Sequence, residues 1–120
     1  IQVRMNKSEF QTILINLLRN AYEAIVEAKK QSGKVILRLK KTNPKWFMIE
    51  VTDNGKGIDT ETQNHLYAPY FSTKVTGMGM GLFWIRRIVE NNGGNIEYDP
   101  INDNEGATFR VKLPINEIGE

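Results

Sequence analysis

Cysteine is absent from this 120-residue sequence, which excludes disulfide bonds and thiolate catalysis and agrees with a reducing compartment. A formal net charge of +2 is too small to favour nucleic acid or a membrane surface as a partner. The apolar runs fall far short of the roughly 20 residues that cross a membrane, and no signal peptide opens the chain. We therefore expect one cytoplasmic domain with no direct membrane contact, from a parent protein that could itself be membrane-anchored.

Apolar periodicity predicts an α/β sandwich, with helices over one face of a mixed sheet. A long helix is expected from Lys7 to about Lys30, with Asn6 as its N-cap and Gly33 ending it. Alternating patterns predict strands, and Ile1–Met5 could add a short edge strand. The other expected helices are at about Thr60–Leu66, with Asp59 as its N-cap, and at Gly81–Asn92. The expected strands are Lys34–Lys41, Trp46–Thr52, Asn95–Asp99 and Ala107–Leu113.

The most distinctive stretch is an alternation of Gly77, Gly79 and Gly81 that runs directly into a helical pattern. Glycine at these positions suits a loop that turns sharply and approaches a ligand closely. A helix start presents unpaired N–H groups and the positive end of its dipole, which favours phosphate. The spacing fits neither the Rossmann nor the Walker pattern, and short glycine-rich turns are common, so this stretch does not identify a ligand by itself.

Two asparagines, Asn16 and Asn20, are four residues apart on one margin of the long helix. Asparagine prefers caps and turns to helix interiors, so the pair requires an explanation. One interpretation is that both amides are solvated or sit at the edge of the core. The other is that they supply neutral oxygen ligands to a hard cation such as Mg²⁺.

The second strand leads into Asp53, followed by Gly55 and Gly57. A carboxylate at a strand end could accept a hydrogen bond from an exocyclic amine, while the glycines let a flat ring approach the backbone. The competing interpretation is an ordinary turn.

Between this strand and the glycine loop, Phe71, Thr73 and Lys74 combine an aromatic ring, a hydroxyl and a cation. This combination predicts a lid over an anionic ligand, and a plain surface loop is the alternative. His65, the only histidine, is interpreted as a surface or packing residue rather than a catalyst.

Four segments in this order resemble the N, G1, F and G2 boxes of the superfamily that contains gyrase, Hsp90, sensor histidine kinases and MutL. The boxes are Asn16–Ala21, Asp53–Gly57, Tyr70–Lys74 and Gly77–Leu82, and Gly106–Phe109 is similar to the family's late Gly-Thr-x-Phe strand. The residues of these segments are most similar to those of the catalytic, ATP-binding domain of bacterial sensor kinases, in the oxygen- and nitrogen-sensing subgroup. The resemblance implies a Bergerat-type α+β sandwich with about five strands, three helices on one face and a flexible ATP lid.

The same resemblance implies residue roles. Asn20 would ligate Mg²⁺, Asn16 would lie by the phosphates or the metal, and Asp53 would pair with the adenine amino group, assisted through water by Gly57 and Thr108. Lys74 and backbone N–H groups of the glycine loop would hold the phosphates. The predicted ATP-binding set is Asn16, Asn20, Asp53, Gly55, Gly57, Ile58, Phe71, Thr73, Lys74, Gly77, Gly79, Met80, Gly81, Leu82 and Thr108, with Asn16, Asn20 and Lys74 as catalytic residues and Asn20 as the metal ligand.

The expected activity is phosphoryl transfer, because Asn16 stands where the family's ATPases carry a glutamate base, and an amide cannot take a proton. The resemblance implies that residues 1–120 form one catalytic domain, monomeric in isolation. Its phosphate would go to a histidine on a separate dimerisation domain of the same kinase, and then to a response regulator. The alternatives are a serine/threonine or dehydrogenase-type kinase of the same superfamily, and a nucleotide-binding interaction module without catalysis.

Overall fold

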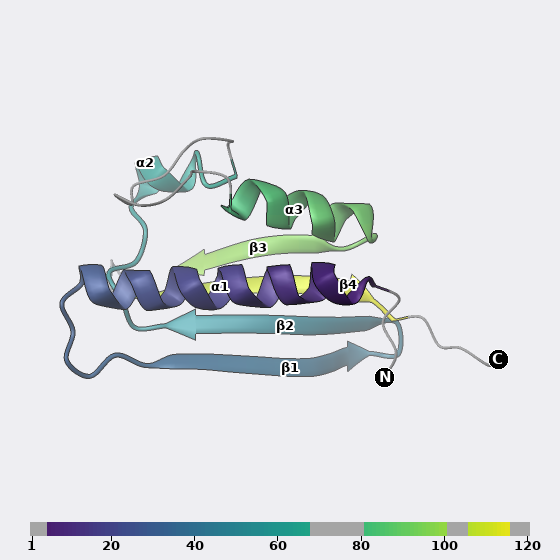
Figure 1. The fold of residues 1–120 in the computed structure, drawn as a ribbon, viewed down its shortest axis with the longest axis horizontal. Coiled ribbons are helices and arrows are strands. Elements are labelled where there is room, and N and C mark those ends of the chain that lie inside the picture. Colours follow the sequence, from purple (N-terminus) through teal and green to yellow (C-terminus); the bar gives the residue numbers. More distant parts are fainter. Residues whose placement is uncertain (1–4, 68–80, 101–105, 116–120) are drawn as a thin grey trace.

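The computed structural model describes residues 5–67, 81–100 and 106–115. Within these ranges the helices and strands follow one another along the chain as drawn in Figure 1. The elements are α1 (Lys7–Glu27), β1 (Val35–Asn43), β2 (Trp46–Asp53), α2 (Thr60–Gln63), α3 (Gly81–Asn91), β3 (Asn95–Pro100) and β4 (Ala107–Pro114).

The sheet has the strand order β1-β2-β4-β3, and each neighbouring pair is antiparallel. Two hairpins therefore lie side by side, joined through β2 and β4, so the prediction of a mixed sheet was wrong. Four strands form this sheet in the described part of the chain, where about five were expected. The suggested first strand, Ile1–Met5, lies almost entirely outside the described residues, and Met5 itself belongs to no strand.

Helices α1 and α3 cover one face of the sheet, α1 over β2 and α3 over β3 and β4, and the two helices contact each other. The predicted third helix is the single turn α2, which has only four residues and buries none of them. It lies at the end of the sheet where β2 and β3 finish (Figure 1), so two helices rather than three make the covering layer.

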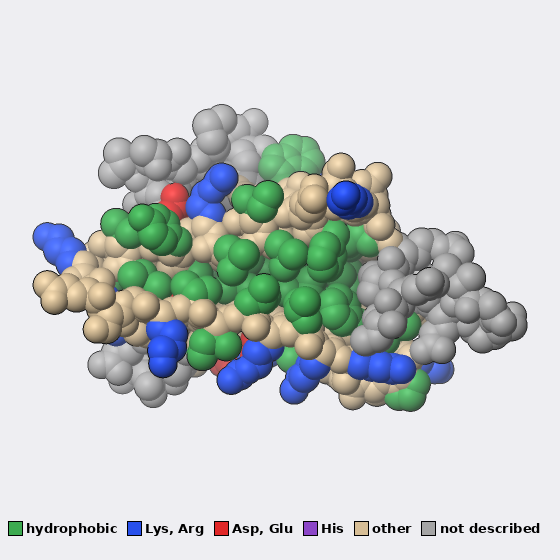
Figure 2. All heavy atoms as spheres, turned by 60° about the horizontal axis from the view of Figure 1, so that its bottom comes forward, with side chains coloured by type: hydrophobic (Ala, Val, Ile, Leu, Met, Phe, Trp, Pro, Cys, Tyr) green, Lys and Arg blue, Asp and Glu red, His purple; other side chains and the backbone are tan. Residues whose placement is uncertain are grey.

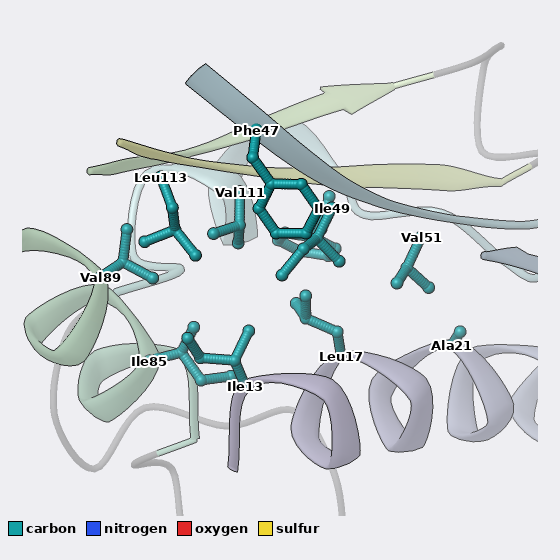
Figure 3. Close-up of a cluster of buried hydrophobic side chains, with 11 residues drawn as sticks. Ile13, Leu17, Ala21, Phe47, Ile49, Val51, Ile85, Val89, Val111 and Leu113 are labelled. Carbon is teal, nitrogen blue, oxygen red and sulfur yellow. The ribbon is translucent and has the colours of Figure 1, made fainter. Parts of the chain in front are cut away.

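The hydrophobic core lies between these helices and the sheet. Side chains from α1 and α3 point toward apolar side chains that descend from β2 and β4 (Figure 3). Because strand residues two apart share a face, each of these strands contributes every second residue. The fully enclosed members include Ile13, Leu17, Ile85, Val89, Ile49, Val111 and Leu113.

The helix starts follow the sequence signals, but one helix end does not. Asn6 accepts a hydrogen bond from the Ser8 N–H at 2.7 Å, and Asp59 accepts one from the Thr62 N–H at 2.7 Å, which confirms both N-caps. The first helix was expected to run to about Lys30 with Gly33 ending it, but α1 ends at Glu27. Lys29 takes the left-handed conformation (φ 56°), and the N–H groups after the cap bond back into the last turn, as in a Schellman motif.

Strand β1 is the least covered strand, and all nine of its residues are exposed. Large apolar side chains remain accessible on α1 and β1, including Ile15, Val26, Leu37 and Leu39. Figure 2 brings the lower side of Figure 1 toward the reader, and apolar side chains gather across the face that it shows. No described helix is long and apolar enough to cross a membrane.

Candidate functional site

One end of the site is a buried carboxylate. Asp53 closes β2 with only 5% of its surface exposed, and its Oδ1 accepts a hydrogen bond from the Gly55 N–H at 2.8 Å. Burial raises the pKa of the Asp53 carboxyl above its ordinary value of 3.8, although the Gly55 and Ala107 N–H groups and the charge of Lys30 act in the opposite direction. The result is an enclosed hydrogen-bond acceptor at a strand end.

The loop after Asp53 is pressed against the last turns of α1. A Cβ added to Gly55 would lie 2.6 Å from the Ala24 carbonyl carbon, so only glycine fits there. The Lys56 N–H donates to the Ala24 carbonyl at 3.3 Å, and the Lys56 ammonium pairs with Glu27 at 2.9 Å. Gly57 takes a positive φ of 73°, which other residues rarely adopt. The loop after Asp53 therefore packs directly against the backbone of α1 at Ala24.

The other end of the site is where α1 meets the start of α3. The Asn16 side-chain N–H₂ donates to the Thr12 carbonyl at 2.8 Å. Its amide oxygen faces Gly81, 3.2 Å from where a Cβ on that glycine would stand. A polar amide oxygen is thus held beside the first residue of α3.

The first turn of α3 differs from those of the other two helices. The first turns of α1 and α2 each contain a glutamate, Glu9 and Glu61, whereas the first turn of α3 contains no acidic residue. An anion near this helix start would gain from the helix dipole and would meet no opposing carboxylate within that turn. The geometry favours phosphate over a cation at this end.

The two ends are connected by one face of α1. Asn16, Asn20 and Ala24 follow one another at four-residue intervals, so their side chains lie along one row of the helix. At 1.5 Å per residue the row is about 12 Å long. Asn16 faces Gly81 at one end and Ala24 contacts Gly55 at the other, so the half-buried Asn20 lies between the two ends of the site.

Thr108 is not brought together with Asp53. Register pairs Asp53 with Ala107, while Thr108 pairs with Thr52, and their hydroxyl oxygens are 3.0 Å apart. Neighbouring strand residues point to opposite faces, so the Thr108 hydroxyl lies on the face of the sheet away from α1. The strand position beside Asp53 thus belongs to Ala107, which has no hydroxyl.

Two residues near Asp53 were missed by the sequence analysis. Asn54 fastens the α1–β1 connection, because its side chain accepts from the Lys34 N–H at 2.8 Å and donates to the Ser32 carbonyl at 3.0 Å. Tyr98 on β3 buries its hydroxyl, which finds no hydrogen-bond acceptor within residues 5–67, 81–100 and 106–115. Strand alternation shows that Tyr98 faces inward, but only the pairing of β3 with β4 shows that it lies near Asp53.

Other predicted residues are placed only in part. Ile58 and Leu82 are half-buried and pack against the core. His65 is exposed, as expected of a surface residue. No cluster of three or more His, Cys, Asp or Glu side chains suited to a metal occurs in the described part of the chain. The predicted lid and loop residues Phe71, Thr73, Lys74, Gly77, Gly79 and Met80 lie outside the described residues.

Comparison with known families agrees with this geometry. The model of the histidine kinase-, DNA gyrase B- and HSP90-like ATPase family matches residues 5–117. The chain belongs to this family. The family match makes the domain an ATP-binding domain of the kind found in kinases.

Similar family members are sensor proteins several times longer than this chain. Sensor histidine kinase ZraS of Salmonella typhi is 32% identical over 114 residues, covering 95% of this chain and 23% of ZraS. Sensor protein FixL of Bradyrhizobium diazoefficiens is 36% identical over 112 residues, covering 93% and 22%. C4-dicarboxylate transport sensor protein DctS of Rhodobacter capsulatus is 35% identical over 117 residues, covering 98% and 18%. The chain spans about a fifth of the length of these relatives.

Solved structures share the fold. The mycobacterial sensor histidine kinase MprB superposes with a TM-score of 0.81 at 24% identity, over 93% of this chain and 76% of that one. The nucleotide-free catalytic domain of histidine kinase ThkA superposes with a TM-score of 0.76 at 28% identity, over 93% and 70%. The predicted α+β sandwich of a kinase catalytic domain is confirmed.

Proposed function

We propose that this domain binds ATP with Mg²⁺ and transfers the γ-phosphate to a histidine on a separate dimerisation domain of the same sensor kinase, which then serves a response regulator. The similarity to ZraS and FixL supports this proposal, because their names describe sensor proteins and, for ZraS, a histidine kinase. The chain corresponds to about a fifth of their length, which is consistent with one domain of a larger kinase.

The observation that carries the proposal is the order of groups along α1. At one end a buried carboxylate, Asp53, precedes a glycine-containing loop that packs against Ala24 of α1. At the other end the start of α3 meets Asn16. The separation of about 12 Å suits an adenine base at one end and a phosphate chain at the other.

The residues present fit ATP and Mg²⁺. Asp53 would accept from the adenine amino group, with Gly55, Gly57 and Ile58 around the ring. Asn20 would offer its amide oxygen to Mg²⁺, which binds through few protein oxygens and completes its shell with phosphate and water. Gly81 and Leu82 would present backbone N–H groups to the phosphates. The remaining phosphate and lid contacts would come from Phe71, Thr73, Lys74, Gly77, Gly79 and Met80.

Bound Mg²⁺ would supply charge neutralisation to the phosphates. The residues of this chain would bind and orient the nucleotide, since phosphoryl transfer depends mainly on positioning and electrostatics. Asn16 would contact the phosphates or the metal without removing a proton from water, so hydrolysis is expected to be slow. The acceptor histidine would come from another domain, because His65, the only histidine of the sequence, is exposed in the turn that follows the short α2.

Two experiments test the proposal. Fluorescence binding of an ATP analogue, with and without Mg²⁺, should show saturable binding that Mg²⁺ strengthens. The domain is then mixed with the helical dimerisation domain of its parent protein and γ-labelled ATP, and the product should be acid-labile and base-stable, as phosphohistidine is. The Asp53→Asn variant is the matched control, and it should transfer little label from ATP to the dimerisation domain.

Other results would point to other functions. A base-labile, acid-stable product would indicate a serine or threonine kinase of the same superfamily. Tight nucleotide binding with no phosphate transfer to any added domain would indicate a binding module.

A further inference from the structure

The hydroxyl of Tyr98 is buried and has no hydrogen-bond partner in the described part of the chain. Its ring packs against Phe109 with the centroids 5.2 Å apart, which fixes the direction of the side chain. The hydroxyl lies beside the Ile58 backbone amide, in the loop that follows the two glycines after Asp53. A buried polar group without a partner is rare in folded proteins and needs an explanation.

The sheet register places Tyr98 on the same face as Asp53. Tyr98 pairs with Phe109 on β4, and Phe109 pairs with Val51 on β2, so these three side chains form one row. Asp53 is two residues beyond Val51 and therefore points to the same side of the sheet. The two polar groups are close enough to interact: burial raises the pKa of Tyr98, the Ile58 amide lowers it, and the negative charge of Asp53 raises it further.

The chemistry of adenine calls for two groups on this side of the pocket. Its amino group is a donor, which a carboxylate such as Asp53 can accept, but the ring nitrogen next to the amino group is an acceptor and needs a donor. Ala107, the strand neighbour of Asp53, offers no polar side chain. The Tyr98 hydroxyl can donate on the same face, and its proton has no acceptor among the described residues.

We propose that the Tyr98 hydroxyl donates a hydrogen bond to the adenine ring nitrogen adjacent to the amino group, directly or through one water, while Asp53 accepts from the amino group. This inference rests on the proposed function, because it takes ATP as the ligand. The pair would also reject guanine, which presents an acceptor oxygen to the Asp53 carboxylate at the position of the amino group. Asp53 and Tyr98 together would thus determine which base is bound.

Calorimetric titration of the Tyr98→Phe variant tests this directly. ATP affinity should fall about three- to tenfold, the usual effect of losing one neutral hydrogen bond. Tripolyphosphate, which has no base, should bind the variant and the original protein equally. 1-Deaza-ATP, in which C–H replaces the ring nitrogen, should also bind both equally. Tyr22→Phe, which removes a hydroxyl from a tyrosine that is 65% exposed on α1, should bind ATP unchanged.

Three results would overturn the inference or its basis. ATP affinity of Tyr98→Phe equal to that of Tyr22→Phe would exclude Tyr98 from base recognition. An equal loss of affinity for ATP and 1-deaza-ATP would show that the hydroxyl acts through the fold rather than through the ring nitrogen. If the original protein bound no ATP at all, the proposed function would fail, whatever the Tyr98 variant did.

Discussion

The two carboxylates of β2, Glu50 and Asp53, lie on opposite faces of one strand and have opposite surroundings. Glu50, on the face away from the helices, is held between Arg38 at 3.2 Å and Arg110 at 2.8 Å. Hydrogen bonds from these two arginines hold the pKa of Glu50 below its ordinary value of 4.5, and Arg110 contributes most. Burial acts in the opposite direction. Asp53, on the helix face, has its pKa raised by burial.

This contrast separates a charge that is compensated within the fold from one that we propose binds a ligand. The charge of Glu50 is compensated within the fold, so that face needs no ligand. Asp53 makes none of the ion pairs formed by the described side chains and is surrounded mainly by backbone N–H groups. A buried carboxylate that makes no ion pair with a described side chain is suited to a neutral donor such as an adenine amino group, and groups with perturbed pKa values concentrate at functional sites.

The largest expected effect is the loss of nucleotide binding in Asp53→Asn. Replacing the carboxylate by an amide removes a charged acceptor, and we expect ATP affinity to fall about 30- to 150-fold, or about 2–3 kcal/mol. Calorimetry with ATP and with tripolyphosphate measures the two ends of the site separately. Equal losses for both ligands would refute the assignment of Asp53 to the base.

Gly55→Ala should have the next largest effect, because it displaces the loop that carries the contact to Asp53. The new Cβ would meet the Ala24 backbone at 2.6–2.7 Å, so the free energy of unfolding should fall by about 2 kcal/mol. Gly81→Ala is the matched control at the other end of the site. There the nearest atom is the Asn16 side-chain oxygen at 3.2 Å, and the change should stay within about 0.5 kcal/mol. Urea unfolding measures the free energy of unfolding of both variants. Equal destabilisation by Gly55→Ala and Gly81→Ala would contradict the prediction that only Gly55 is tightly packed.

Glu50→Gln should destabilise the fold by about 1–2 kcal/mol without changing ATP affinity. The loss is moderated because Arg38 is more than half exposed and its pairing is screened by water. Chemical unfolding and calorimetry together measure both quantities, and weakened ATP binding would show that the two faces of β2 are coupled.

The pH dependence of stability gives the opposite sign for the two residues. The pKa of Glu50 is lowered on folding, so its stabilisation is complete above pH 4.5 and is lost as pH falls through the folded-state pKa. The pKa of Asp53 is raised, so its ionisation costs stability at neutral pH, and that cost disappears as pH falls toward 3.8. Unfolding curves of Glu50→Gln and Asp53→Asn across this range should therefore depart from the original protein in opposite directions.

Asn20→Ala should have the smallest effect, confined to the metal-dependent part of binding. We expect ATP affinity in Mg²⁺ to fall about tenfold, or 1.4 kcal/mol, with affinity in EDTA unchanged. Asn20→Asp, which keeps an oxygen ligand, is the control that should retain a response to Mg²⁺. A full Mg²⁺ response in Asn20→Ala would remove Asn20 from the metal site.

Local signals in the sequence predicted the elements well. Alternating apolar residues located the four strands within one or two residues, and Asn6 and Asp59 were correctly identified as helix caps. Gly33 was wrongly expected to end the first helix, because Lys29 adopts the left-handed conformation that glycine usually supplies. Propensity was overridden there by the hydrogen bonds that close the last turn of α1.

The sequence by itself determined the chemistry of the site: a carboxylate followed by glycines, two asparagines one helical turn apart, and a glycine loop before a helix. These are local patterns, and each is fixed by the conformations that its residues can adopt. Only the tertiary structure decided which of them meet. The pairing of β2 with β4 puts Ala107 rather than Thr108 beside Asp53. The pairing of β3 with β4 puts Tyr98 on the same face of the sheet. A shift of one residue reverses the face of a side chain, and pairing between distant strands sets that register.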